Sequence, residues 1–172
     1  MTTKVVHSEN PLEHWSDITD VTNKVVLDLG CGWLFQPFQS TPEYFISRGA
    51  SRVVGIDASC GEIEKLTKTY PDHFFACKEI KKPEDLQILI GFCQPQVIKM
   101  DIEGYESVID LMTAQDFSSV EEIAVEYHNP TCKRILLEKL PAFGFTVFAI
   151  NQFGWFCLDI NQMGILHAKK TK

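Results

Sequence analysis

Short apolar runs alternate with longer amphipathic segments along most of the chain. The first run, at residues 25–29, stops at a Gly-Cys-Gly sequence, as a buried strand does where it enters a tight turn. A helix is predicted after it, because residues 40–43 offer an N-cap candidate, with Pro42 at the first helical position and Glu43 in the first turn, and Gly49 ends the segment. Further helices are predicted at 61–70, 83–93, 105–113 and 131–140, and further strands at 52–57, 73–80, 96–102 and 122–127.

Two more strands are predicted near the end of the chain, at residues 145–150 and 155–160. The linker between them, residues 151–154, is too short for a crossover helix, so these two strands must pair antiparallel. Repeated strand and helix segments that end in such a hairpin predict an α/β fold. We expect a mostly parallel, seven-stranded sheet with a C-terminal antiparallel hairpin and helices on both faces.

The organisation of the chain predicts a single domain over residues 1–172. No internal repeat, low-complexity tract or Pro/Gly/Ser-rich linker divides it, and residues 1–23 form a polar, weakly patterned N-terminal segment. The only run of charge, Lys169, Lys170 and Lys172, is expected to be a solvated tail.

The charge balance and the hydropathy disfavour two classes of partner. There are 16 Lys and Arg residues and 23 Asp and Glu residues, so the net charge is −7 and a nucleic acid would meet a repulsive average field. No apolar stretch approaches the ~20 residues of a membrane span, and the N-terminal segment has no signal-peptide core. We therefore predict a cytoplasmic protein that binds neither nucleic acid nor a membrane.

The 6 cysteines are widely and irregularly spaced and include no C-x-x-C pair. This pattern disfavours a zinc knuckle and a small disulfide scaffold. We expect reduced thiols that mostly pack inside the protein. They are Cys31, Cys60, Cys77, Cys93, Cys132 and Cys157.

The residues at strand ends are the candidates for a site, because ligands of open α/β sheets bind beyond the carboxyl ends of the strands. The first predicted strand runs into the D-L-G-C-G sequence of residues 28–32, where glycines let a ligand approach the backbone. Asp57 ends the next strand, and its carboxylate can accept hydrogen bonds from both hydroxyls of a ribose. Together they predict a nucleoside site. A tight turn without a ligand, and Asp57 as a turn cap, are the structural alternatives.

The glycine turn and the acid at the next strand end resemble the cofactor site of class I S-adenosylmethionine-dependent methyltransferases, a family whose topology also ends in an antiparallel hairpin. In that family the first-strand acid and the glycines hold the amino-acid end of the cofactor, and the second-strand acid holds its ribose. The resemblance implies a Rossmann-like class I methyltransferase fold and a cofactor site formed by Asp28, Gly30, Cys31, Gly32, Asp57 and Ala58.

One departure from that family follows the glycine turn, where many members have a third glycine. Trp33 stands there instead and residues 34–39 lengthen the loop, so Trp33 either weakens cofactor binding, shields the cofactor or packs on the sheet. A nicotinamide site would need G-x-G-x-x-G, but Phe35 occupies the third glycine position. An NAD-dependent oxidoreductase is therefore a less favoured alternative.

A second signal lies at the end of the fourth predicted strand, where residues 99–106 form a K-x-D-x-E-G-x-E run. This run, together with the following strand that leads to Glu126-Tyr127-His128, resembles the FkbM family of methyltransferases. Members of that family mostly methylate hydroxyl oxygens of sugars and related metabolites. The resemblance implies S-adenosylmethionine as cofactor and a small-molecule hydroxyl as acceptor.

The residues at these two strand ends are candidates for catalysis. Alternation along an extended segment sends Lys99, Asp101 and Glu103 to one side, and Asp101 is placed to orient or deprotonate an acceptor hydroxyl. His128 with the neighbouring Glu126 is a candidate general base. Alternatively, Asp101, Glu126 and His128 could hold a divalent metal that lowers the pKa of the hydroxyl. The structural alternatives are Glu106 as a cap of the next helix and His128 as a loop histidine.

These patterns together predict a methyltransferase that acts on a small-molecule hydroxyl. Two other classes are alternatives: a cofactor-binding module without turnover, and the oxidoreductase on a similar sheet. Few residues are left to cover an acceptor. We therefore expect either a homo-oligomer, in which a second subunit completes the acceptor pocket, or a pocket open to a large substrate.

Overall fold

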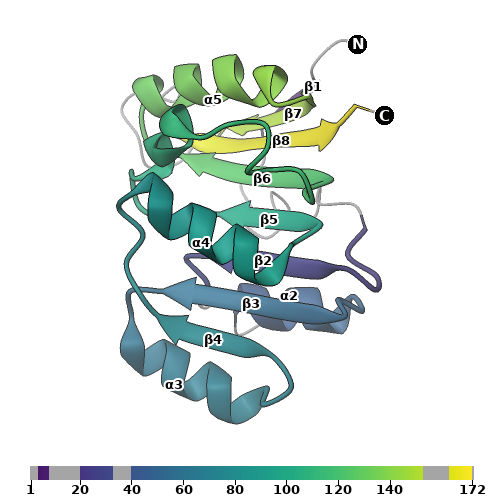
Figure 1. Cartoon of the computed structure of the whole chain (residues 1–172), viewed down its shortest axis with the longest axis vertical. Helices are drawn as coiled ribbons and strands as arrows, with labels where there is room; N and C mark the ends of the chain where they lie inside the picture. Colours follow the sequence, from purple (N-terminus) through teal and green to yellow (C-terminus); the bar gives the residue numbers. More distant parts are fainter. Residues whose placement is uncertain (1–3, 8–19, 33–39, 153–162, 172) are drawn as a thin grey trace.

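The computed structural model describes residues 4–7, 20–32, 40–152 and 163–171, and the strands of this part form one mixed sheet (Figure 1). The strands are β1 (Lys4–His7), β2 (Val25–Leu29), β3 (Arg52–Asp57), β4 (Phe74–Cys77), β5 (Val97–Met100), β6 (Glu122–Tyr127), β7 (Phe145–Gln152) and β8 (Gly164–Lys170). Their order across the sheet is β1-β7-β8-β6-β5-β2-β3-β4.

The direction of the strands confirms the predicted topology. Strands β2 to β6 run parallel, and β8 lies antiparallel between β6 and β7. After β2 the chain builds outward through β3 to β4, and it then returns to add β5 on the other side of β2. The strand order therefore reverses beside β2, which is where a ligand site is expected.

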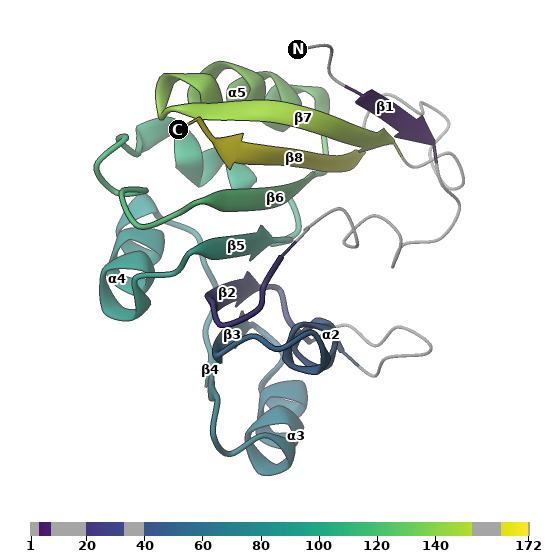
Figure 2. The same ribbon diagram turned by 90° about the vertical axis from the view of Figure 1, so that its right-hand side faces the viewer.

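Helices cover both faces of the sheet, with α4 on one side and α2 on the other in Figure 2. The helices are α2 (Thr41–Ser47), α3 (Cys60–Thr69), α4 (Pro83–Cys93), the 3₁₀ helix η1 (Glu106–Leu111) and α5 (Pro130–Ala142). Side chains alternate along β2, so Leu27 and Leu29 pack with α4, η1 and α5, while Val26 packs with α2 and α3. All three side chains are fully buried, as expected for a central parallel strand.

Polar side chains set the starts of two helices. Ser40 Oγ accepts a hydrogen bond from the Glu43 N–H at 3.3 Å and caps α2, so the helix begins at Thr41, one residue before the predicted start at Pro42. Helix α5 is capped by Asn129, whose Oδ1 accepts from the Cys132 N–H at 2.9 Å. His128 is therefore held between the end of β6 and the cap of α5.

The last strand differs from the prediction. The segment expected to form it, residues 155–160, lies outside the described residues, and the observed strand is β8. Ile165 and Leu166 are fully buried in it, because β8 pairs with both β6 and β7. Lys169 and Lys170 belong to this strand and not to a solvated tail, and Lys170 Nζ donates to two backbone carbonyls before β6 at 2.7 and 3.2 Å.

Two other segments also differ from the sequence expectations. Lys4–His7, within the weakly patterned N-terminal segment, forms β1 and pairs parallel with β7. The helix predicted at 105–113 is the shorter 3₁₀ helix η1. A turn precedes it in which Glu103 and Gly104 both have positive φ, 54° and 96°. This left-handed turn redirects the chain after β5 and brings the start of η1 beside the end of β6.

The prediction of reduced cysteines is wrong for one pair. Cys60, at the start of α3, and Cys77, at the end of β4, form a disulfide with their Cα atoms 4.9 Å apart. No local motif marks this pair, because packing of α3 against the sheet edge brings the two residues together. The other cysteines are Cys31, Cys93 and Cys132, which are free and buried, and Cys157, which lies outside the described residues.

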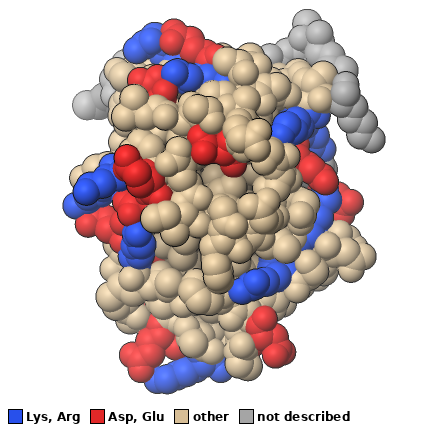
Figure 3. Space-filling view, in the orientation of Figure 1, with Lys and Arg blue, Asp and Glu red and all other residues tan. Residues whose placement is uncertain are grey.

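No helix in the described part of the chain combines the length and the apolar character needed to cross a membrane. On the face shown in Figure 3, acidic and basic side chains are interspersed over a mostly uncharged surface. The described residues on this face therefore form no broad basic patch.

Candidate active site

A cavity of about 150 Å³ lies at the carboxyl ends of the central strands, beside the point where the strand order reverses. Four of the predicted site residues line it: Gly30, Asp57, Ala58 and Asp101. They lie at the carboxyl ends of β2, β3 and β5, so the topology brings residues that are far apart in the chain onto one cavity. Open α/β sheets bind their ligands at this position.

Gly30 is required by the packing of β2 against β5. Its φ is 75°, and the carbonyl oxygen of Asp101 occupies the space that a Cβ would need. The Gly30 N–H donates to the carbonyl of Ile56 at 2.8 Å, and the Asp101 N–H donates to that of Leu29 at 2.9 Å. The glycine therefore has a structural role of its own, which is to let the end of β5 reach the turn.

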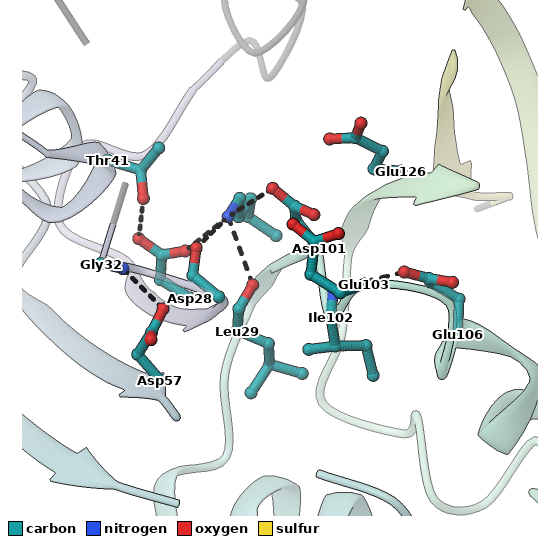
Figure 4. A network of polar contacts seen from close by, with 12 residues as sticks. Asp28, Leu29, Gly32, Thr41, Asp57, Asp101, Ile102, Glu103, Glu106 and Glu126 are labelled. Carbon is teal, nitrogen blue, oxygen red and sulfur yellow. Dashed lines mark hydrogen bonds and ion pairs between the residues drawn. The ribbon is translucent and has the colours of Figure 1, made fainter. Parts of the chain in front are cut away.

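Asp57 joins the turns that follow β2 and β3 (Figure 4). Its Oδ2 accepts from the Gly32 N–H at 2.8 Å, and its Oδ1 accepts from the Ser59 N–H at 2.7 Å. A Cβ on Gly32 would lie 2.9 Å from the Asp57 Cγ, so this close approach needs glycine. The carboxylate thus caps its own turn, as the structural alternative predicted. Each oxygen can still accept another hydrogen bond, because a carboxylate oxygen has two lone pairs.

Asp28 and Lys99 form a buried pair behind the glycine turn. Their side chains are 0% and 1% exposed, and Lys99 Nζ lies 3.4 Å from Asp28 Oδ1. The hydroxyl of Thr41 donates to Asp28 Oδ2 at 2.6 Å. Lys99 Nζ also donates to the carbonyls of Leu29 at 3.2 Å and Gly30 at 2.6 Å. The pair therefore holds the backbone of the turn in place.

The pKa shifts of this pair follow from burial and mutual attraction. Burial raises the pKa of Asp28, while the charge of Lys99 acts in the opposite direction. Burial alone would lower the pKa of Lys99, but the carboxylates of Asp28 and Asp101 outweigh it and raise that pKa. Direct contact of Asp28 with a cofactor, and of Lys99 with an acceptor, stay predictions, since both side chains lie behind the turn.

His128 is surrounded by four carboxyl groups, which come from β6, from the segment after β5 and from the start of η1. Its Nδ1 lies 2.9 Å from Glu106 Oε1. Its Nε2 lies 3.7 Å from Asp101 Oδ1, 3.6 Å from Glu103 Oε2 and 3.8 Å from Glu126 Oε1. Figure 4 shows the acidic side chains that follow β5 on one side and Glu126 on the neighbouring strand β6. The fold therefore brings three predicted residues, Asp101, Glu126 and His128, into one cluster.

Glu106 does not cap the helix as predicted: it caps the turn before η1 and makes a contact that local sequence patterns do not indicate. Its Oε1 accepts from the N–H groups of Ile102 at 3.3 Å and Gly104 at 3.1 Å, so it caps the turn before η1. The same oxygen contacts His128, which is 22 residues further along the chain. Parallel pairing of β5 with β6 creates this contact, and no short motif could have revealed it.

The pKa values of the cluster are shifted by burial and by the crowding of charge. Burial alone would lower the pKa of His128, but the hydrogen bond and charge of Glu106, with Glu126 and Asp101, raise it to about 9. Burial and the charge of Asp101 raise the pKa of Glu126 to about 8, against the effect of His128. Both groups therefore bind a proton more readily than the free side chains do.

Asp101, Glu126 and His128 could also hold a divalent cation. Each offers one ligand atom, and these atoms all lie within 4.8 Å of one another. Carboxylate oxygens with one imidazole nitrogen suit cations such as Mn²⁺. A bound cation would displace the protons carried by Glu126 and His128, because such ligands bind in their deprotonated form.

Lys78, Glu79 and Ile80 line the cavity but were missed by sequence reasoning. They follow β4, which ends at Cys77, whereas the pattern predicted a strand that continued to Ile80. A prediction that ended this strand at Cys77 would have indicated these residues, because site residues follow strand ends. Trp33 and Phe35, which the sequence also singled out, lie outside the described residues.

Comparisons with known proteins identify the fold. No protein-family profile and no curated protein sequence matches the chain. The chain is similar in structure to precorrin-6y C5,15-methyltransferase from Geobacter metallireducens GS-15, with 15% identity, a TM-score of 0.61, and 93% of this chain and 86% of that chain covered.

Two further solved structures are similar. One is Burkholderia thailandensis 1,6-didemethyltoxoflavin-N1-methyltransferase with bound S-adenosylhomocysteine, with 16% identity, a TM-score of 0.59, and 88% of this chain and 72% of that chain covered. The other is Aeropyrum pernix fibrillarin with bound S-adenosyl-L-methionine, with 13% identity and a TM-score of 0.60; 91% of this chain and 71% of that chain are covered. At these identities the likeness shows the fold, and it confirms the predicted Rossmann-like class I methyltransferase architecture.

Proposed function

We propose that this protein is an S-adenosylmethionine-dependent methyltransferase that methylates a hydroxyl group of a sugar or another small metabolite. The observation that carries the proposal is that Asp57 and Asp101 line one cavity on either side of the glycine turn. Two structurally similar proteins contain S-adenosylmethionine or S-adenosylhomocysteine, which supports a cofactor of this kind.

The cofactor would be held by the turns after β2 and β3. We assign its amino-acid end to residues 30–32, with Asp28 behind them, and its ribose to Asp57, with Ala58 beside it. When bound, the cofactor supplies a methyl group that its sulfonium already activates. The protein therefore has mainly to align the acceptor oxygen with that methyl group.

The acidic run at residues 99–106 supports an FkbM-like protein and a hydroxyl acceptor. Asp101 lines the cavity, and Glu106, the last residue of the run, contacts His128. The class I fold requires neither feature, because it needs only a cofactor site at the ends of its first strands. An acid and a paired histidine beside the cofactor site are suited to removing a proton from an acceptor.

An acceptor hydroxyl has to lose its proton as its oxygen takes the methyl group. We assign orientation of the hydroxyl to Asp101 and acceptance of the proton to His128 Nε2, with Glu126 on the rim of the same cluster. Because the pKa of His128 is raised to about 9, turnover should increase with pH until the imidazole is neutral. A divalent metal on these three residues would act by lowering the pKa of the hydroxyl instead.

Calorimetry with S-adenosylhomocysteine and with NAD⁺ is the first test. We expect the purified protein to bind the former and not the latter. Transfer of a labelled methyl group from S-adenosylmethionine to a panel of hydroxylated metabolites is the second test. Binding without transfer to any acceptor would indicate a cofactor-binding module, and binding of NAD⁺ alone would contradict the proposal.

A further inference from the structure

Glu106 is a fully buried carboxyl group that contacts its hydrogen-bond partners through one oxygen, Oε1. Oε1 accepts from the N–H groups of Ile102 and Gly104 and lies 2.9 Å from His128 Nδ1. Oε2 is buried and has no hydrogen-bond partner among the described residues. Burying a carboxyl group in this way costs stability, and capping one turn does not require it.

The contacts of Glu106 assign the tautomer of His128. Because Oε1 already accepts from two backbone N–H groups, it faces the imidazole as an acceptor, and Nδ1 is the donor. A neutral ring then carries its lone pair on Nε2. Nε2 is also the atom that faces Asp101, at 3.7 Å, on the cavity side of the cluster.

We infer that Glu106 is a positioning residue, which holds the His128 ring and its tautomer so that Nε2 is free to take a proton from the acceptor. The catalytic part of this inference rests on the proposed methyl transfer, whereas the pairing rests on geometry alone. A base that is oriented by a third group is a recurring arrangement in enzymes.

The backbone on both sides of the pair is well held. Glu106 begins η1, directly after the left-handed turn at Glu103 and Gly104. His128 lies between β6 and Asn129, which caps α5. Little conformational entropy is therefore lost when the two side chains meet, so the pair can set the orientation of the ring.

The charged groups that face His128 come from three parts of the fold. Glu106 comes from η1, Asp101 and Glu103 from the segment after β5, and Glu126 from β6. Glu106→Gln keeps the shape of the side chain but removes the charge and replaces one carboxylate oxygen by an NH₂ group. We therefore expect the neutral ring of this variant to have a smaller preference for the tautomer with its hydrogen on Nδ1, because an NH₂ group can donate to Nδ1.

The test compares Glu106→Gln with Glu122→Gln in the full chain. Glu122 is also a buried carboxyl group, but it lies at the opposite end of β6 from His128. Nitrogen-15 NMR of the neutral imidazole reports the tautomer, and kcat reports the proposed reaction. Glu106→Gln should lower the population of the tautomer with its hydrogen on Nδ1 and reduce kcat about 10-fold, with unchanged affinity for S-adenosylhomocysteine. Glu122→Gln should leave the imidazole signals and kcat unchanged.

The outcomes separate this inference from the proposed function. An unchanged tautomer population in Glu106→Gln would overturn the inference and leave Glu106 as a turn cap. A neutral wild-type ring with its hydrogen on Nε2 would also overturn it, even if the variant did not fold. A changed tautomer population in a protein that transfers no methyl group would support the pairing and contradict the proposed function.

Discussion

At the scale of single residues, several side chains of the site also hold the fold together. Asp57 accepts hydrogen bonds from two backbone N–H groups, and Gly30 lets β5 approach β2. Lys99 donates hydrogen bonds to the carbonyls of the glycine turn. A substitution at any of them changes stability as well as binding. Each residue-scale prediction therefore needs a measurement of unfolding beside the functional assay.

We expect Asp57→Ala to weaken binding of S-adenosylhomocysteine by about 1.5 to 3 kcal/mol, because charge-assisted hydrogen bonds to the ribose would be lost. Isothermal titration calorimetry measures this loss, and chemical unfolding measures the effect of leaving the Gly32 and Ser59 N–H groups without their acceptor. Asp72→Ala, an exposed acid before β4, is the control and should bind like the wild type. An affinity that is unchanged in Asp57→Ala would remove Asp57 from the cofactor site.

Asp101→Asn and His128→Ala should leave cofactor affinity near that of the wild type and lower turnover by roughly 10²-fold or more, the scale of general-base loss. Both side chains belong to the cluster after β5 and β6, apart from the turn that would hold the ribose. Labelled methyl transfer and calorimetry on the same preparations separate the two effects. Full activity in both variants would mean that the cluster is structural.

A divalent metal would change the result of this experiment in a specific way. If a cation on Asp101, Glu126 and His128 mediates catalysis, a chelator should lower wild-type turnover as much as the substitutions do. Added Mn²⁺ should then restore the turnover of the wild type but not the turnover of the variants. Turnover that does not respond to the chelator would favour proton transfer to His128.

At the scale of elements, the site consists of the segments that follow β2, β3, β4, β5 and β6. Each strand is placed by burial, whereas each following turn is placed by a few polar contacts. The disulfide between Cys60 and Cys77 adds a covalent link between α3 and the end of β4. The Sγ atoms of these residues lie 4.0 and 3.7 Å from the carbonyl oxygen of Ala58, so the link borders the cavity.

The double variant Cys60→Ser/Cys77→Ser should be less stable than the oxidised wild type by about 3 kcal/mol, since the bond closes a short loop in the unfolded chain. The sequence separation of the two residues is 17. Urea unfolding with and without reductant measures the difference. Reductant should destabilise the wild type and have no effect on the double variant. Equal stability of all four samples would contradict a contribution from the bond.

At the scale of the whole molecule, the sheet buries a continuous apolar layer on each face, and we propose that residues 1–172 form a single domain. Homo-oligomeric assembly and a cytoplasmic location stay predictions. Disulfides are typical of oxidising compartments, so the redox state of Cys60 and Cys77 in cells bears directly on the location.

The free energy of unfolding should fall as the pH rises from about 4.5 to about 9. The pKa of Glu126 is raised from 4.5 to about 8, and that of His128 from 6.5 to about 9, so these two groups bind more protons in the folded state than in the unfolded state across this range. Urea unfolding at a series of pH values measures the decline. Glu126→Gln should reduce it between pH 4.5 and 8, while Glu84→Gln, an exposed acid on α4, should not. An increase in stability over this range would contradict the assigned shifts.

The sequence by itself determined the central elements and the class of the fold. Strands β2, β3, β5 and β6 lie close to where their apolar runs predicted them, because a strand buried on both faces needs a continuous hydrophobic segment. The glycine turn and Asp57 were predicted for a similar reason, since tight turns and strand-end acids have local signatures. The final strand was not predicted at its observed position, because β8 ends in Lys169 and Lys170 and is buried only through its pairing with β6 and β7.

Only the tertiary structure decided which of these local features meet. The reversal of strand order beside β2 brings Asp57 and Asp101 to one cavity, and the pairing of β5 with β6 brings Glu106 to His128. The Cys60–Cys77 disulfide depends in the same way on packing at the sheet edge. The physical reason is that hydrophobic periodicity and turn preferences act between near neighbours in the chain. Contacts between distant residues depend instead on a strand order that is favoured only when the whole sheet is buried.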